Sequence, residues 1–143
     1  MSTSSLTLTI VWLDEHMLEL ELQVKSERFT GRTNFYTELD APSILAAKLV
    51  DFPITSTDVR MHEFGTADLP GYGTAEITLC NRDSSGHLLV RVDMSWTPDS
   101  PRDLIQSAVT RVLCSPAEVD SFVSQLRSMT LEVGQSASLC EYP

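Results

Sequence analysis

Histidine and acidic side chains in the middle of the sequence are the residues whose types could hold a metal ion. His62 and Glu63 are adjacent, with Asp58 before them and Asp68 after them. Imidazole and carboxylate groups bind zinc and other transition metals, but known sites use recurring spacings that this segment lacks. We therefore expect no metal site, and we interpret the segment as an exposed polar loop.

Four further acidic residues fall on the polar faces of predicted strands. They are Glu19, Glu21, Glu76 and Asp93. Paired carboxylates do acid–base chemistry only in a pocket that shifts their pKa values, whereas on the solvated side of a sheet they form an acidic surface. We expect these four residues to contact a partner, because strand alternation projects them away from the core.

Sequence motifs for catalysis or cofactor binding are absent. There is no nucleophile motif, no phosphate-binding glycine loop and no zinc signature. The segment 83–86, Asp-Ser-Ser-Gly, resembles part of a calcium loop but lacks the later acidic ligands, so we expect a β-turn. The sequence thus predicts neither enzyme activity nor a cofactor.

The charge balance of the chain is strongly acidic. Its 143 residues include 20 Asp and Glu against 10 Lys and Arg, a net charge of −10. Binding to nucleic acid or to an anionic membrane needs clustered cations, so we expect neither as a partner. A basic protein is the partner that this charge favours. The alternative is that the charge only keeps the chain soluble and monomeric.

The cysteines and the N-terminus predict a cytoplasmic location. Cys80, Cys114 and Cys140 are odd in number and show no CxxC spacing, which favours free thiols in a reducing compartment. Cys80 and Cys114 are expected in the core. The first residues lack the basic and apolar regions of a signal peptide, and no run is long enough for a transmembrane helix.

Alternation of apolar and polar residues predicts the strands. Between residues 17 and 24, leucines and Val24 occupy one face while Glu19 and Glu21 occupy the other, a period of two that excludes the rival helical interpretation. Trp12 and Trp96 are expected in the core. The predicted strands are 6–13, 17–24, 28–39, a short one near 59–64, 74–81, 87–96 and 102–114.

Two helices are predicted from their start signals and apolar spacing. Ser115, Pro116 and Glu118 form an N-cap, a favourable first residue and a capping box. Apolar residues then recur at helical spacing: Val119, Phe122, Val123, Leu126 and Met129. The first helix begins after Asp40 as its cap and ends at Pro53.

These elements predict an α+β fold. We expect a single domain over residues 1–143 with one mainly antiparallel sheet of about six to seven strands, and two amphipathic helices packed on it. Residues 1–5 and 131–143 are expected to be less ordered.

Several of these landmarks together resemble a known group of proteins. They are Phe29-Thr-Gly31, the segment 45–53, the hairpin 83–92, and 115–118 with 122–126. The chain resembles small uncharacterised single-domain bacterial proteins, some of which are similar to immunity proteins of polymorphic toxin systems. The resemblance covers most of residues 6–130 and implies an intracellular protein without chemistry of its own that binds a partner protein.

Three function classes follow from these observations. The first is a non-catalytic cytoplasmic protein-binding module, such as a toxin-immunity protein. The second is a small acidic secretion chaperone that dimerises, although such chaperones typically begin with a helix and this chain begins with strands. The third is an enzyme without a recognisable motif. A homodimer is possible in the first two classes, and the functional surface is either the polar sheet face or the segment 54–73.

Overall fold

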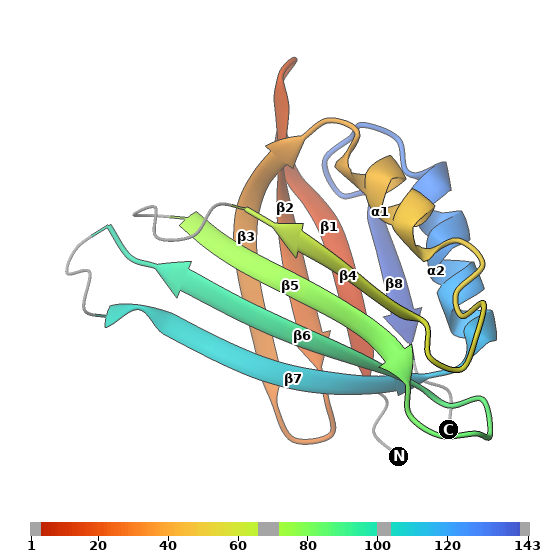
Figure 1. The fold of residues 1–143 in the computed structure, drawn as a ribbon. Helices are drawn as coiled ribbons and strands as arrows, with labels where there is room; N and C mark the ends of the chain where they lie inside the picture. Colours follow the sequence, from red (N-terminus) through yellow and green to blue (C-terminus); the bar gives the residue numbers. More distant parts are fainter. Residues whose placement is uncertain (1–3, 66–71, 100–103, 141–143) are drawn as a thin grey trace.

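The computed structural model describes residues 4–65, 72–99 and 104–140. The described residues form eight strands in two antiparallel sheets of four strands each, with two α-helices. The α+β class and the antiparallel pairing are confirmed. The expected single sheet of six to seven strands is wrong, because the strands divide into two layers (Figure 1).

Neighbouring strands in each sheet are consecutive in the sequence, except that β8 lies beside β1. Sheet A has the order β3-β2-β1-β8, and sheet B has the order β4-β5-β6-β7. The strands of sheet A are β1 (Ser5–Leu13), β2 (Met17–Lys25), β3 (Thr30–Glu38) and β8 (Ser136–Cys140). Those of sheet B are β4 (Val59–Phe64), β5 (Tyr72–Asn81), β6 (Leu88–Thr97) and β7 (Gln106–Cys114). The helices are α1 (Ala41–Leu49) and α2 (Pro116–Ser128).

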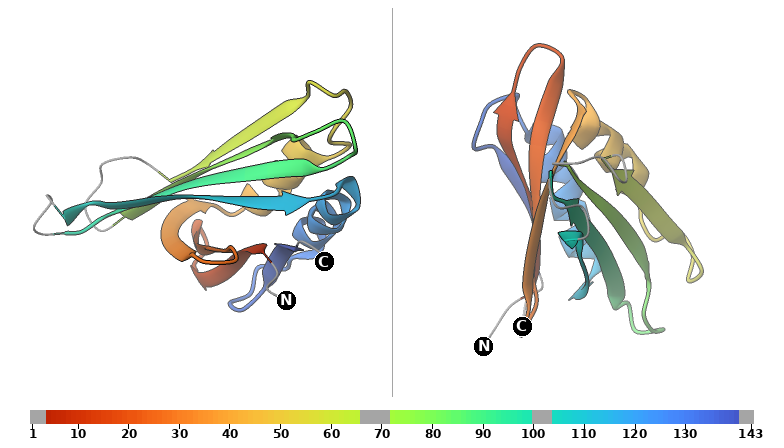
Figure 2. Two further views of the ribbon diagram at one scale, coloured as in Figure 1. Left: turned by 90° about the horizontal axis from the view of Figure 1, so that it is seen from below. Right: turned by 90° about the vertical axis from the view of Figure 1, so that its left-hand side faces the viewer.

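The sheets meet along β3 and separate toward β8. Strand β3 contacts β5 and β6 of the other sheet, whereas α1 contacts β4, α2 contacts β8, and the helices contact each other. Figure 2 shows both helices on the side where the layers diverge. The helices therefore fill the wide side of a wedge whose narrow side is the contact between the two sheets.

The contact between the sheets depends on a glycine. The hydroxyl of Thr33 on β3 donates to the backbone oxygen of Ser95 on β6 at 2.9 Å. A Cβ atom at Gly73 on β5 would collide with the Thr33 hydroxyl and with the backbone oxygen of Asn34. Gly73 thus permits the backbones of β3 and β5 to approach at a distance that no other residue allows.

One hydrophobic core lies between the sheets and the helices. The alternating leucines of β2 are buried, and the predicted inward positions of β5 are confirmed, including Ile77 and Leu79. On α2, the buried residues are Val119, Phe122, Val123 and Leu126, as the helical spacing predicts. The capping box is also confirmed, since the Ser115 N–H donates to Oε2 of Glu118 at 3.1 Å.

Both tryptophans were expected in the core and both are partly exposed. Trp12 is 42% exposed because the pairing of β1 with β2 shifts register between Ile10 and Trp12, a bulge that turns Trp12 to the outer face. There its ring contacts Tyr36 edge-on, with 5.9 Å between centroids. Trp96 is 38% exposed, at the end of β6 that projects past sheet A (Figure 1).

The C-terminal segment contains a strand that we did not expect. Within the predicted tail 131–143, β8 pairs antiparallel with β1, and Ala137 and Leu139 are buried. The amide of Gln125 on α2 bonds both backbone groups of Ser138, at 2.9 and 3.0 Å. A side chain thus covers the edge of β8 that has no neighbouring strand. At the other terminus, β1 already begins at Ser5, and residues 1–3 lie outside the described residues.

The first helix is shorter than predicted. It ends at Leu49 and not at Pro53, and the side chain of Asp40 makes no capping hydrogen bond. Arg60 on β4 holds the helix end, because its Nη1 donates to the backbone oxygens of Lys48 at 2.9 Å and Val50 at 3.2 Å. The segment after α1 is therefore tied to sheet B.

The last predicted strand begins later than predicted, and it buries the opposite face from the one predicted. Strand β7 begins at Gln106, and Arg102 lies outside the described residues. The inward positions are Thr110, Val112 and Cys114, whereas Ile105 and Val109 are exposed. Cys114 is in the core as expected, but Cys80 is half-buried on the outer face of β5, and none of the three cysteines forms a disulfide.

Phe122 tests the docking of α2. Its side chain is 2% exposed, so Phe122→Ala should lower the free energy of unfolding by about 3–5 kcal/mol through the cavity that it leaves. The matched control is Ser124→Ala on the exposed face of the same helix, which should change stability by less than about 0.5 kcal/mol. Urea denaturation measures both. A loss below about 1 kcal/mol for Phe122→Ala would show that α2 does not dock as described.

Candidate functional site

The outer face of sheet B arranges its side chains in rows that run across the strands. Residues paired in register on neighbouring strands point to the same side, so each row joins one outward residue from each of three or four adjacent strands. One row is apolar, the next is basic, the next is acidic and the last carries hydroxyls. The rows are Val59–Cys80–Leu89–Leu113, Met61–Thr78–Arg91–Arg111, Glu63–Glu76–Asp93–Val109, and Thr74–Ser95–Ser107.

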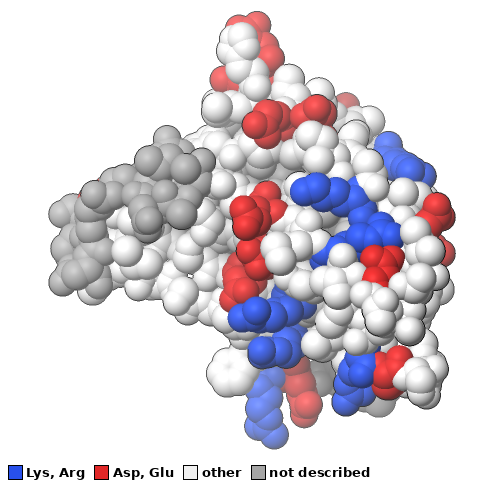
Figure 3. All heavy atoms as spheres, viewed as in Figure 1, with Lys and Arg blue, Asp and Glu red and all other residues white. Residues whose placement is uncertain are grey.

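The acidic row places three carboxylates side by side. Glu63 pairs with Glu76, and Glu76 pairs with Asp93, on three adjacent strands. Figure 3 shows acidic side chains gathered near the middle of this face, close to a group of basic ones. Like charges directly opposite each other destabilise a sheet. Folding alone therefore does not account for this row, which makes it a candidate binding surface.

The carboxylates of this row influence each other. Partial burial raises the pKa of Glu76, and a hydrogen bond with Glu63 and the charges of Glu63 and Asp93 raise it further, while Arg91 lowers it. Among the described residues, the counter-ion of this row is Arg91, whose Nη2 lies 3.4 Å from Oδ2 of Asp93. The row as a whole thus carries an excess of negative charge and would gain from an external cation.

A shallow hollow of about 390 Å³ lies on the same face. The three carboxylates line one part of it, and hydroxyl-bearing and apolar residues, among them Phe64 and Met94, line the rest. The hydroxyls of Thr74 and Ser95 bond to each other at 2.6 Å. The hollow therefore combines fixed negative charge with hydrogen-bonding groups and the exposed side chain of Val109.

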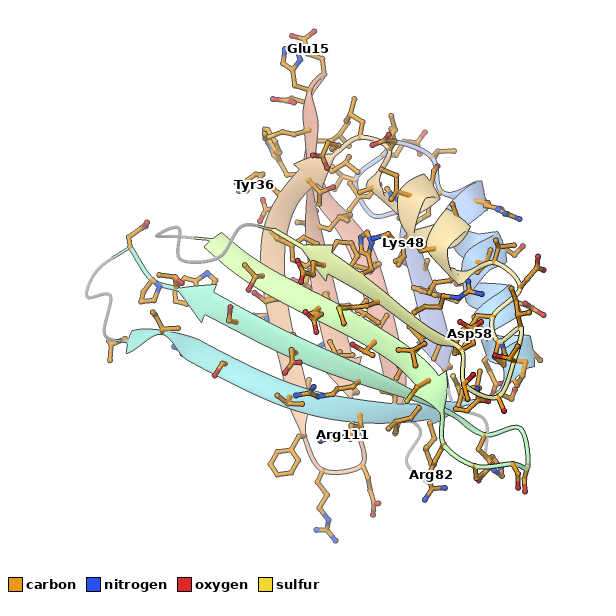
Figure 4. All side chains as sticks on the ribbon, viewed as in Figure 1. Glu15, Tyr36, Lys48, Asp58, Arg82 and Arg111 are labelled. Carbon is orange, nitrogen blue, oxygen red and sulfur yellow. The ribbon has the colours of Figure 1, made fainter. Side chains whose placement is uncertain are left out.

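The four acids predicted from the sequence fall on two separate surfaces. Glu76 and Asp93 lie together on sheet B, whereas Glu19 and Glu21 lie on the outer face of sheet A. Oε2 of Glu19 accepts a hydrogen bond from Asn34 at 3.0 Å, and Glu19 shares a row with Tyr36. Figure 4 shows Tyr36 on β3, in the sheet behind β5. The four residues therefore do not form one continuous surface for a partner.

Glu63 is the residue of the acidic row that the sequence analysis missed. It was considered only as a metal ligand beside His62. The predicted strand at 59–64 is confirmed as β4, and its alternation places Glu63 outward and His62 inward. The alternation in this strand already indicated that Glu63 points outward. The pairing of Glu63 with Glu76, however, depends on a register between strands that local patterns do not specify.

The residues considered for a metal do not converge. His62 is buried, so the exposed loop expected there is wrong, and Glu63 points to the opposite face. Asp58 forms a two-bond ion pair with Arg60, at 2.8 and 2.9 Å, which lowers the pKa of Asp58. Asp68 lies outside the described residues. Within the described part of the chain, no three His, Cys, Asp or Glu side chains form a group that could hold a metal.

The segment 83–86 forms the expected turn. The carboxylate of Asp83 accepts the N–H of Ser85 at 2.8 Å and lies 2.8 Å from Nδ1 of His87. The bond from Ser85 is the main reason that the pKa of Asp83 is lowered, followed by the bond from His87. Gly86 has a φ of 87°, a conformation that favours glycine. Asp83 thus closes a hairpin turn between β5 and β6.

Comparison with models of protein families, with curated proteins and with solved structures finds no match to this chain. The resemblance to immunity proteins therefore stays a prediction. In the described residues, no helix has the length and apolarity needed to cross a membrane.

His62 makes a pH-dependent contribution to stability. Its ring packs edge-on against Phe64 with 4.4 Å between centroids, and its Nδ1 has no hydrogen-bond partner in the described structure. Burial lowers the pKa of His62 to about 4, and the charge of Lys48 adds to this effect while Glu63 opposes it. The folded chain therefore holds His62 neutral, whereas the unfolded chain protonates it near its ordinary pKa.

The contribution of His62 to the free energy of unfolding should consequently be complete above a pH of about 6.5. As the pH drops toward about 4, the free energy of unfolding should fall by up to about 3 kcal/mol. His62→Leu should remove most of the loss between pH of about 7 and 5, a range in which carboxylates contribute little. Urea denaturation at several pH values measures this. The exposed His16→Ala is the control and should keep the wild-type slope. A His62→Leu variant with an unchanged slope would contradict the assignment.

Proposed function

We propose that this chain is a non-catalytic protein-binding module whose binding surface is the acidic row on the outer face of sheet B. The observation that carries the proposal is the alignment of Glu63, Glu76 and Asp93 on adjacent strands. Such a row costs stability within the sheet, and a basic partner would compensate that cost.

The chemistry of this face favours a partner with Lys or Arg side chains. A cation that enters the hollow would meet three carboxylates and would favour the charged form of Glu76, whose pKa is raised in the free chain. The hydroxyl row beside it offers donors and acceptors to a polypeptide backbone. The partner is therefore a protein segment with a basic side chain at its centre.

The overall charge supports the same choice of partner. A net charge of −10 attracts a basic protein from a distance and increases the association rate at low ionic strength. We propose a cytoplasmic setting in which the partner is a basic toxin domain, as the resemblance to immunity proteins implies. The second acidic pair, Glu19 and Glu21, contributes to this general attraction but lies on the other sheet.

The test compares two pairs of neutralised acids in the same chain. The partner is first captured from the source organism, and its binding kinetics are then measured at low and high salt. Glu76→Gln with Asp93→Asn should slow association by about tenfold at low salt and by less at high salt. Glu19→Gln with Glu21→Gln changes the net charge equally and should slow association only a few-fold. An equal effect of both pairs would contradict the proposed surface, and a substrate turned over by the purified chain would contradict the class.

A further inference from the structure

We propose that β7 of one copy of this chain pairs antiparallel with β7 of a second copy, which joins the two B sheets into one continuous sheet. This inference goes beyond binding of a basic partner and does not depend on it. The starting observation is that β7 is the edge strand of sheet B (Figure 1). An edge strand presents unpaired N–H and C=O groups that can pair with another chain.

The edge strands β8 and β4 lie against other segments of the same chain. Gln125 occupies the edge of β8 with two hydrogen bonds, and β4 lies beside α1, whose C-terminal end Arg60 holds. In the described structure, the backbone of β7 residues 106–113 pairs with β6 and bonds to no other segment. The edge of β7 along residues 106–113 thus lacks contacts of the kind that β8 makes with Gln125 and β4 makes with α1.

The sequence of β7 lacks the residues that usually protect an edge. Residues 106–114 contain no proline, glycine, lysine or acidic residue, and Arg111 is their one charged residue. The first four residues of β7 are exposed on both faces. Val109 is 46% exposed, and Ile105 directly before the strand is also exposed. This edge is therefore long, uncovered and partly apolar, features that favour pairing with another strand.

The outer face of β7 is self-complementary in one register. A two-fold axis perpendicular to the sheet keeps outward residues opposite outward residues. With Val109 on that axis, Val109 faces its own copy, Ile105 faces Leu113, and Ser107 faces Arg111. Apolar side chains then meet each other, and no two charges of the same sign stand opposite. Moving the axis to Arg111 would place two arginines together, which is unfavourable.

The same register aligns the acidic rows of the two copies. Asp93 pairs with Val109 within each sheet, so the two rows would run end to end through the Val109 pair. Figure 4 shows Arg111 on β7, at the lower margin of sheet B. In the dimer this arginine stays on the shared outer face, and the dimer would present two acidic hollows related by the axis.

Dimerisation should be weak and concentration-dependent. A single pair of strands is a narrower contact than a standard protein interface, and both copies carry a charge of −10. Sedimentation equilibrium at physiological salt should show a dimer fraction that rises between about 1 and 200 μM. A chain that stays monomeric over this range would overturn the proposal, while leaving binding of a basic partner unaffected.

Substitution on the axis tests the surface. Val109→Lys places two like charges opposite each other and should abolish the dimer. The control is Val133→Lys, at a position that is 65% exposed in the turn before β8, and it should dimerise like the wild type. Both variants should retain the wild-type denaturation midpoint, since both positions are exposed. Equal dimerisation of the two variants would overturn the proposal.

Cysteine cross-linking tests the register. Residues directly opposite in an antiparallel pair have Cα atoms about 4.5–5.5 Å apart, within the range of a disulfide. Under oxidation, Val109→Cys should form more disulfide-linked dimer than the wild type. Ser107→Cys and Arg111→Cys should each give little disulfide-linked dimer alone. The two variants should cross-link when they are mixed, because these positions face each other. Cross-linking of Ser107→Cys alone at the level of Val109→Cys would exclude this register.

Discussion

The close crossing of β3 over β5 and β6 is the constraint on which the rest of the structure depends. Gly73 allows the two backbones to approach, and the hydroxyl of Thr33 satisfies a backbone oxygen of β6 at the crossing. Because the sheets touch on this side, they must diverge on the other, and the two helices fill the space that opens. The wedge is thus a consequence of one tight contact and of the volume of two helices.

This arrangement determines where polar chemistry can lie. The inner faces of both sheets and one side of each helix share a single core, in which His62 is a buried histidine with an unpartnered nitrogen. No Asp, Glu, Lys or Arg side chain of the described residues is buried in this core. On sheet B, the pairing of strands brings Glu63, Glu76 and Asp93 into one row, so the fold concentrates negative charge that is dispersed along the sequence.

Local patterns predicted most elements of the fold, but not their arrangement. The alternation in β2 and the capping box at Ser115 identify a strand and a helix, because each depends on neighbours in sequence. The outward position of Trp12 depends on a bulge, and β8 has only two buried residues in five, so neither leaves a clear local signal. The division into two sheets and the row that contains Glu63 depend on contacts between distant strands, which a single sequence does not specify.

The central claim is that the outer face of sheet B attracts a basic polypeptide. It is tested most directly by titrating the isotope-labelled chain with an oligolysine peptide and following the backbone amide NMR signals. The account predicts that shift changes concentrate on Glu63, Glu76, Asp93 and their neighbours in β4, β5 and β6, and that they weaken as salt is added. Changes centred on Glu19 and Glu21 in sheet A, or spread evenly over all acidic residues, would contradict it.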